Sequence, residues 1–468
     1  MPRMRRYAPI IGTVSLLCLV TAMTSAASAA PAGGVKGDPQ PEMTPFRIGA
    51  TESAGTVAVE SNGSIVVTYD IGVGNGKTVV CVLGRGGRKC SHKVTLTPPG
   101  APDTFGTPQV FAPSPGHVVV LQNTTEFDYL YTSTNGGVSF GAPVQVGTLS
   151  VGAAALIGSD IVFGAGDDGS GAQVESVAVT ATGPPATTAT ATTAAATDFG
   201  VGSYKGGALV ASDFDGSKYY TTYVAYARSG TNFNASGSYH NVAKIGREQL
   251  IGISGDALLT MQGTGKNALE LRLFNGKGFG PAHVVPGTSG GGPEWFTLDQ
   301  DPSGRVHVFN ESIHYPRIYN LYEVSTSTGA HWSGAVDLGD AIQSNEFAAA
   351  LDARGSGLVL GTSPAWGYPV LATQSVSFKL KASTIASGHH TTGSGKGSPA
   401  GHGREVALQV ERSGRWYTVA TTHESSSGSF SFTIKGKAAG HYDYRAVASD
   451  LAGYLQFGYS AVRSLHVS

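Results

Sequence analysis

An internal repeat of about 48 residues constrains the fold of this chain more than any other feature. Short apolar runs that end in a polar turn recur along most of the sequence, with start-to-start spacings of 45 to 52 residues. A unit of this length cannot bury its own apolar face, so neighbouring units must pack against one another. The seven runs begin at Thr56, Thr107, Ala153, Val201, Leu250, Trp295 and Phe347.

Each repeat contains four short strand-like segments. Glycine is abundant, at 66 of 468 residues, and only 13% of residues are charged, which favours β structure over helical bundles and α/β enzymes. No segment shows a sustained apolar period of three to four residues, so we expect no connecting helices. In the sixth repeat the expected strands cover residues 296–300, 306–310, 319–325 and 335–338.

Four antiparallel strands that recur at this spacing are typical of a β-propeller, in which each blade covers the faces of its neighbours. We therefore predict an all-β fold with a seven-bladed propeller over residues 43–377. The alternative is six blades, if the third unit, with its Thr/Ala-rich stretch 184–196, is an elaborated loop.

One turn carries a resemblance to a known family. Residues 133–140, with Ser133, Asn135, Gly137 and Phe140, resemble the Asp-box, or bacterial neuraminidase repeat, whose pattern is Ser-x-Asp-x-Gly-x-Thr-Trp. Residues 325–332 resemble a degenerate second copy with Ser327 in the Asp place. In such a turn a short polar side chain caps backbone N–H groups, so the motif supports a sialidase-like fold and supplies no chemistry.

The resemblance implies candidate catalytic residues. Sialidases hold a carboxylate with three arginines and use a Tyr/Glu pair as nucleophile and an Asp as acid/base. Residues 46–49 resemble the family's Arg-Ile-Pro element, which makes Arg47 the candidate for the first clamp arginine. Residues 68–72 are similar to its next strand, which carries Tyr-Asp-x-Arg, and this adds Asp70 as a candidate.

The catalytic set is incomplete in the sequence. Gly49 replaces the proline, Gly72 stands in the second arginine position, and the loop 73–77 has no carboxylate. We therefore expect a binding or surface-interaction protein for glycans; the alternative is an exo-sialidase-type glycoside hydrolase with a rearranged site. Other residues could complete such a site, but their spacing in the sequence does not single them out. They are Arg272, Arg305, Arg317, Arg354, Tyr319, Tyr368, Glu294 and Glu346.

Other ligand sites have weaker support. Trp295, Trp366 and Tyr368 are candidate ligand-binding residues because exposed aromatic rings stack on sugars. Acidic turns at 167–169 and 213–216 lack a complete calcium-loop spacing, so we expect no cofactor and no metal site. His307, His314 and His331 are too irregularly spaced to indicate a metal.

The N-terminus and the cysteines indicate the compartment. Residues 1–29 combine arginines, a short apolar run and a small-residue cleavage site, as in a secretory signal peptide. Cys81 and Cys90 would then be the two cysteines of an extracellular protein, and we expect them to form a disulfide across a glycine-rich hairpin. No later apolar segment is long enough for a membrane span.

The repeat of about 48 residues ends near residue 376, and the sequence pattern changes. Residues 378–403 are Ser/Gly/His-rich and read as a linker or a first hairpin, and residues 404–468 resemble the Ig-like sandwich modules of secreted bacterial proteins. The overall net charge of −1 gives no reason to propose nucleic acid as partner. Residues 376–468 hold ten Lys/Arg against five Asp/Glu, so an anionic cell-surface polymer is a candidate partner, and a spacer role is the alternative.

Overall fold

The structure is a computed structural model in which the described residues are entirely β-strands, turns and irregular segments. This confirms the all-β prediction for those residues. They are 45–49, 55–71, 76–100, 107–124, 127–147, 151–167, 171–179, 198–214, 220–229, 232–235, 248–262, 268–288, 296–312, 320–333, 335–340, 347–361, 365–372, 374–400, 403–449 and 457–468.

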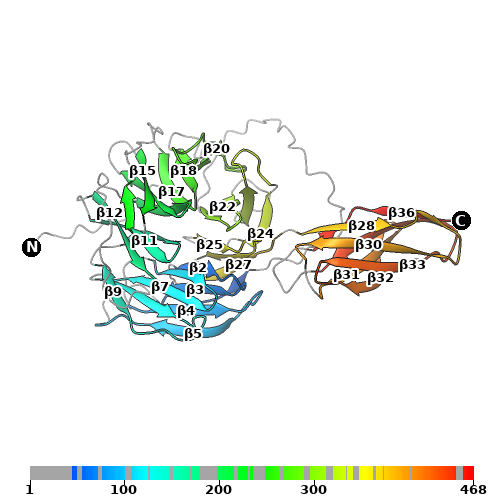
Figure 1. Cartoon of the computed structure of the whole chain (residues 1–468), viewed down its shortest axis with the longest axis horizontal. Helices are drawn as coiled ribbons and strands as arrows, with labels where there is room; N and C mark the ends of the chain where they lie inside the picture. The colour runs from blue at the N-terminus through cyan, green and yellow to red at the C-terminus, as the bar shows by residue number, and fades with distance from the viewer. Residues whose placement is uncertain are drawn as a thin grey trace, which may run out of the picture. The chain divides into compact units, whose positions relative to one another are not determined.

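Small antiparallel sheets follow one another along residues 46–370 (Figure 1). Each of the first sheets is ordered as in the sequence. They comprise β2 (Gly55–Val59), β3 (Ile65–Asp70), β4 (Thr78–Leu83) and β5 (Cys90–Leu96); β6 (Gln109–Ser114), β7 (His117–Asn123), β8 (Asp128–Ser133) and β9 (Val144–Gly147); β10 (Val151–Ile157), β11 (Asp160–Asp167) and β12 (Gly171–Ala178); and β13 (Asp198–Tyr204), β14 (Gly207–Phe214), β15 (Tyr220–Ser229) and β16 (Asn232–Ala235).

The next sheets have the same form, and the third repeat has a sheet of its own. The last sheet of the series differs, because β1 from the start of the chain is added to its edge in the order β1-β27-β26-β25. These sheets comprise β17 (Glu248–Ser254), β18 (Ala257–Gln262), β19 (Leu269–Leu273) and β20 (His283–Val284); β21 (Phe296–Gln300), β22 (Val306–Ser312), β23 (Asn320–Thr326) and β24 (Val336–Asp340); and β25 (Phe347–Leu351), β26 (Gly357–Gly361), β27 (Trp366–Val370) and β1 (Phe46–Arg47).

The first strands of these sheets contact one another in a closed circuit. Strand β2 contacts β6, and the contacts continue through β10, β13, β17, β21 and β25, which contacts β2 again. Between each sheet and the next lies a separate apolar cluster; the one between the last and the first sheet contains Val67, Tyr69 and Leu360. The arrangement is that of a β-propeller-like fold, in which sheets cover one another face to face.

This packing explains why the middle strands are apolar on both faces. Every residue of β3 and of β4 is buried, and their sequences are Ile-Val-Val-Thr-Tyr-Asp and Thr-Val-Val-Cys-Val-Leu. A strand covered by sheets on both sides has no solvent face, so β-branched residues follow one another without polar alternation.

Residues 375–467 form two further sheets around one core. The smaller sheet contains β28 (Ser375–Leu380), β30 (His390–Ser398) and β33 (Ser429–Lys435), so part of the stretch read as linker or hairpin is a strand. The core contains Phe378, Val406, Phe432 and Leu465. The larger sheet contains β29 (Thr384–Ile385), β31 (Glu405–Arg412), β32 (Arg415–His423), β34 (Gly440–Ala448), β35 (Gly458–Tyr459) and β36 (Arg463–Val467).

Candidate functional site

The segment that resembles an Asp-box is the turn between β8 and β9. The Ser133 hydroxyl accepts a hydrogen bond from the Gly137 N–H at 2.9 Å, and Asn135 Oδ1 accepts one from the Ser139 N–H at 3.0 Å. Gly137 has φ +80°, a left-handed conformation that favours glycine. Phe140 packs against the cluster between the first two sheets. These residues therefore shape the turn.

The second expected copy occupies the equivalent turn between β23 and β24, with one change of residue. The Thr326 hydroxyl accepts the N–H groups of Thr328 and Gly329 at 3.2 and 3.0 Å. Ser327, expected in the Asp place, is exposed. The side chain that accepts these N–H groups thus belongs to Thr326 and not to Ser327, which corrects the role predicted for Ser327.

A third turn of this kind lies between β19 and β20 and was missed in the sequence. Asn275 Oδ1 accepts the N–H groups of Lys277 and Gly278, and Phe274 forms a bridge with Phe279. The Gly280 N–H donates to the Leu273 carbonyl at 2.9 Å, as Gly141 does to Thr132 in the first turn. The available signal was an Asn-Gly-x-Gly-Phe-Gly run at the end of a third strand.

The last sheet brings two candidate residues together. In the pairing of β1 with β27, Arg47 is the partner of Trp366, so the two side chains lie on the same face of the sheet. Arg47 is exposed and its Nε donates to the Gly49 carbonyl at 2.9 Å. Trp366 is half-buried against the cluster that contains Tyr368, and its Nε1 is buried without a hydrogen-bond acceptor among the described residues. A guanidinium and an indole are thus cross-strand partners at the β1 edge of the last sheet of the series.

Asp70 lies at the end of β3, in the neighbouring sheet. Its Oδ1 accepts a hydrogen bond from the Thr78 hydroxyl at 2.7 Å. Burial raises the pKa of Asp70 to about 6, and the bond from Thr78 opposes that rise. Asp70 can therefore change its charge near neutral pH.

Arg47 and Asp70 nevertheless point away from each other. Phe46 and Tyr69 pack in the cluster between the last and the first sheet. Side chains alternate along a strand, so Arg47, the neighbour of Phe46, and Asp70, the neighbour of Tyr69, face away from that cluster on opposite sides. The two residues implied by the sialidase resemblance do not share a pocket among the described residues.

The aromatic candidates have different positions. Tyr368 is fully buried in the cluster between the last two sheets, with Phe347 at a ring-centroid distance of 6.1 Å. Its burial corrects the expectation that this ring is available to a sugar. Trp295 lies outside the described residues, as do Glu294, Arg317, Tyr319 and Glu346.

The remaining arginine candidates do not join Arg47. Arg354 is in the turn between β25 and β26, at the opposite end of the last sheet from Trp366. Arg305 follows β21 and donates through Nε to the Ser325 hydroxyl at 3.1 Å. Arg272 lies in β19, 3.6 Å from Glu270. No carboxylate clamp assembles from these residues.

A buried polar cluster that the sequence did not reveal lies at the β21–β22 turn. His307 Nδ1 is 2.7 Å from Glu323 Oε1 and its Nε2 is 3.3 Å from Asp301 Oδ2. Asp299 accepts hydrogen bonds from the Leu351 N–H and the Ser254 hydroxyl, which belong to the two neighbouring sheets. The cluster links three sheets, and its residues are on different strands, so sequence spacing gave no signal.

The disulfide and the metal expectations also have structural outcomes. Cys81 and Cys90 form a disulfide between β4 and β5, as predicted, with their Cα atoms 5.4 Å apart.

The described part of the chain contains no group of three or more His, Cys, Asp or Glu placed to hold a metal ion. Parts of both acidic turns, 168–169 and 215–216, fall outside it. No helix among the described residues is long and apolar enough to cross a membrane.

No family model and no curated protein matches this chain. Among solved structures, it is similar to prolyl oligopeptidase B from Galerina marginata, with 8% identity, a TM-score of 0.38 and coverage of 86% of this chain and 56% of that one. The chain thus spans little more than half of that protein. It also matches a tandem repeat from the extending region of a large adhesion protein, with 12% identity, a TM-score of 0.19 and coverage of 88% of this chain and 99% of that one.

Proposed function

We propose that this chain is a secreted bacterial glycan-binding protein, built on a seven-bladed sialidase-like propeller followed by an Ig-like domain. The closed circuit of first strands supports the blade number, as does the separate sheet formed by the third repeat. Addition of β1 to the last sheet supports ring closure, because it joins the start of the series to its end. Two sheets around one core support the Ig-like domain.

Two observations support secretion. The expected signal peptide over residues 1–29 would direct export, and the Cys81–Cys90 disulfide is of a kind that persists in oxidising compartments. The three Asp-box-type turns support the sialidase-like character of the propeller, since each occupies the third-to-fourth strand connection of its sheet.

The observation that carries the binding function is the pair Arg47 and Trp366. The part of the indole that stays exposed offers an apolar face to the C–H side of a sugar ring. A guanidinium beside it recognises a carboxylate through charge-assisted hydrogen bonds. The pair therefore fits a glycan that ends in an acidic sugar.

Binding without hydrolysis is favoured by the separation of Arg47 from Asp70. A sialidase needs its acid/base carboxylate and its arginine clamp on the same sugar, and these side chains face different interfaces between sheets. Asp70 is also held by Thr78 inside the protein. We accordingly assign no catalytic step to this pair.

An array of acidic and neutral glycans tests this function, with the chain from residue 30 onward as probe. We expect binding to glycans with a terminal acidic sugar and a loss of about tenfold or more in affinity for Arg47→Ala, since a charge-assisted hydrogen bond is lost. The control is Arg354→Ala, which removes an exposed arginine from the other end of the same sheet. Equal loss in both variants, or no binding to any acidic glycan, would overturn the proposal.

A further inference from the structure

The smaller C-terminal sheet has one face with an unusual composition. Strands β28, β30 and β33 alternate between residues that point into the core and residues that face outward. We call the outward set the Ser/Lys face. Its members are Ser375, Ser377, Lys379, His390, Thr392, Ser394, Lys396, Ser398, Ser429, Ser431, Thr433 and Lys435.

Every residue of the Ser/Lys face is a serine, threonine, lysine or histidine. The strand pairing places Lys396 between Ser377 and Ser429, and Lys379 beside Ser394 on the next row. Successive outward residues along a strand are about 7 Å apart and diagonal neighbours are about 7–8 Å apart. Lys379 and Lys396 are therefore diagonal neighbours flanked by serine hydroxyls, whereas Lys435 lies farther along the sheet, where its cross-strand partner is His390.

The acidic groups of this domain that the structure describes lie elsewhere. Glu424 is buried and forms an ion pair with Arg404 at 2.7 Å. Glu405 and Glu411 are on β31, and Asp443 is on β34, both in the larger sheet. Among the described residues of the domain, no carboxylate neutralises Lys379, Lys396 or Lys435, so the face has an uncompensated positive charge.

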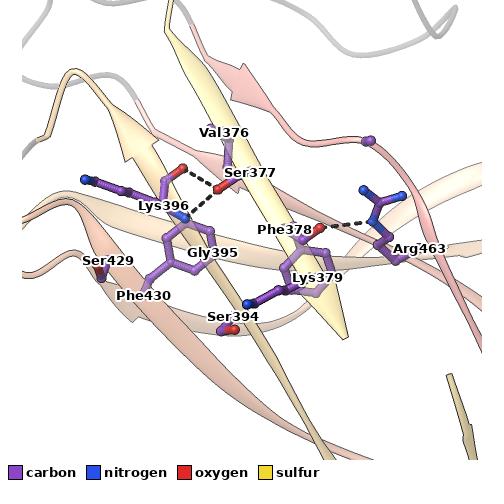
Figure 2. Close-up of a pocket in the computed structure, with 11 residues that line it drawn as sticks. Val376, Ser377, Phe378, Lys379, Ser394, Gly395, Lys396, Ser429, Phe430 and Arg463 are labelled. Carbon is purple, nitrogen blue, oxygen red and sulfur yellow. Dashed lines mark hydrogen bonds between the residues drawn. The ribbon is translucent and has the colours of Figure 1, made fainter. Parts of the chain in front are cut away.

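A depression of about 610 Å³ lies at the β28 side of this face. Figure 2 shows Ser377, Lys379, Ser394 and Lys396 around it, together with Arg463, whose Nε donates to the Phe378 carbonyl at 3.0 Å. Arg463 adds a fourth cation from β36. The hydrogen bond to the Phe378 carbonyl holds the Arg463 side chain close to Lys379, the next residue of β28.

The core side of the same sheet is closely packed. A Cβ atom on Gly393 would lie 2.7 Å from the Phe378 ring, and one on Gly395 would lie 2.5 Å from the Phe430 ring. The two rings therefore pack directly on the backbone of β30. An array of cations and hydroxyls on a closely packed sheet is matched to an extended ligand with repeated charges.

We propose that the Ser/Lys face binds an anionic polysaccharide. The lysines would pair with its carboxylate or sulfate groups, and the serine and threonine hydroxyls would exchange hydrogen bonds with its sugar hydroxyls. The outward side chains of the face include no Phe, Tyr or Trp to stack on nucleic-acid bases and no apolar anchor of the kind found in protein interfaces. This inference deepens the proposed function, because it assigns a second glycan class to a site separate from Arg47 and Trp366.

Three dextrans of matched backbone test the site: dextran sulfate, carboxymethyl dextran and uncharged dextran. We expect the chain from residue 30 onward to bind one or both charged forms, more weakly as salt is added, and to ignore dextran. A variant with Lys379→Ser and Lys396→Ser is expected to bind about fivefold or more weakly. Binding of the sulfated or of the carboxylated form alone identifies the anion.

The matched control removes two cations from outside the face, through Arg412→Ser and Arg415→Ser in the larger sheet. Retained affinity in this control supports the site, whereas an equal loss would show that net charge alone explains the binding and would overturn it. Absence of binding to both charged dextrans at low salt would also overturn it. A lysine variant that loses the charged dextrans but keeps its binding to glycans with a terminal acidic sugar separates this face from the propeller site, so failure of one and failure of the other give different results.

Discussion

At the scale of single residues, buried titratable groups decide how the stability of this protein depends on pH. Burial raises the pKa of Asp70 to about 6, while Thr78 acts in the opposite direction. A carboxyl with a raised folded pKa stabilises the fold below its unfolded pKa, and that contribution is lost as the pH rises through about 6. Asp299 has the same shift for the same main cause, so both act over the same pH window.

We therefore expect Asp70→Asn to remove part of this pH dependence. The variant should match the wild type in unfolding free energy near pH 4 and exceed it by about 2–3 kcal/mol near pH 8, because asparagine never pays the cost of a buried charge. Urea unfolding across this range measures the difference. Parallel pH profiles for the two proteins would contradict the burial of Asp70.

His307 should give a dependence of the same sign as Asp70, at higher pH. Burial by itself lowers its pKa, but the hydrogen bonds and charges of Glu323 and Asp301 raise it above the ordinary value. The stabilisation is fully present below about pH 6.5 and disappears as the pH rises through the folded pKa. We expect His307→Gln to lower the unfolding free energy by about 3 kcal/mol at pH 6, and by less at pH 9. An equal loss at both values would show that His307 acts only through packing.

At the scale of elements, much of the fold was predictable. The strands expected in the sixth repeat agree within two residues with β21, β22, β23 and β24, because apolar runs and Pro/Gly turns are local signals. The pairing of β1 with β27 could not be predicted, since it joins residues more than 300 positions apart and β1 has only two residues. Tyr368 was misjudged because an aromatic residue in a strand looks the same in sequence whether its face is covered or open.

The role of Asn275 in the turn between β19 and β20 can be tested by substitution. Asn275→Ala removes an acceptor for the N–H groups of Lys277 and Gly278, so we expect a loss of about 1 kcal/mol in unfolding free energy. Asn135→Ala should cost a similar amount, because Asn135 serves the same turn in another sheet. Asn275→Asp keeps the acceptor and should stay close to the wild type. Thermal unfolding of the three variants measures these differences. If Asn275→Ala is as stable as the wild type, Asn275 does not hold its turn as Asn135 is expected to hold the first one.

At the scale of the whole molecule, the account depends on closure of the circuit of sheets by β1. Deletion of residues 1–49 removes β1, uncovers the edge of β27 and takes Phe46 from the cluster it shares with Tyr69. We expect a loss of about 3–5 kcal/mol in unfolding free energy, from the apolar contacts and backbone hydrogen bonds together. Deletion of residues 1–44 keeps β1 and is the matched control. Equal stability of the two truncated proteins would mean that β1 does not close the circuit.

The central functional claim is that the propeller binds an acidic glycan at Arg47 and Trp366 and leaves it intact. Saturation-transfer NMR with sialyllactose follows both events in one sample, since magnetisation transfer reports binding and the free-sugar signals report hydrolysis. We predict transfer to the acidic sugar, its loss in Arg47→Ala, and no release of free sugar. Release of free sialic acid that depends on Arg47 would contradict the account and make the chain a sialidase.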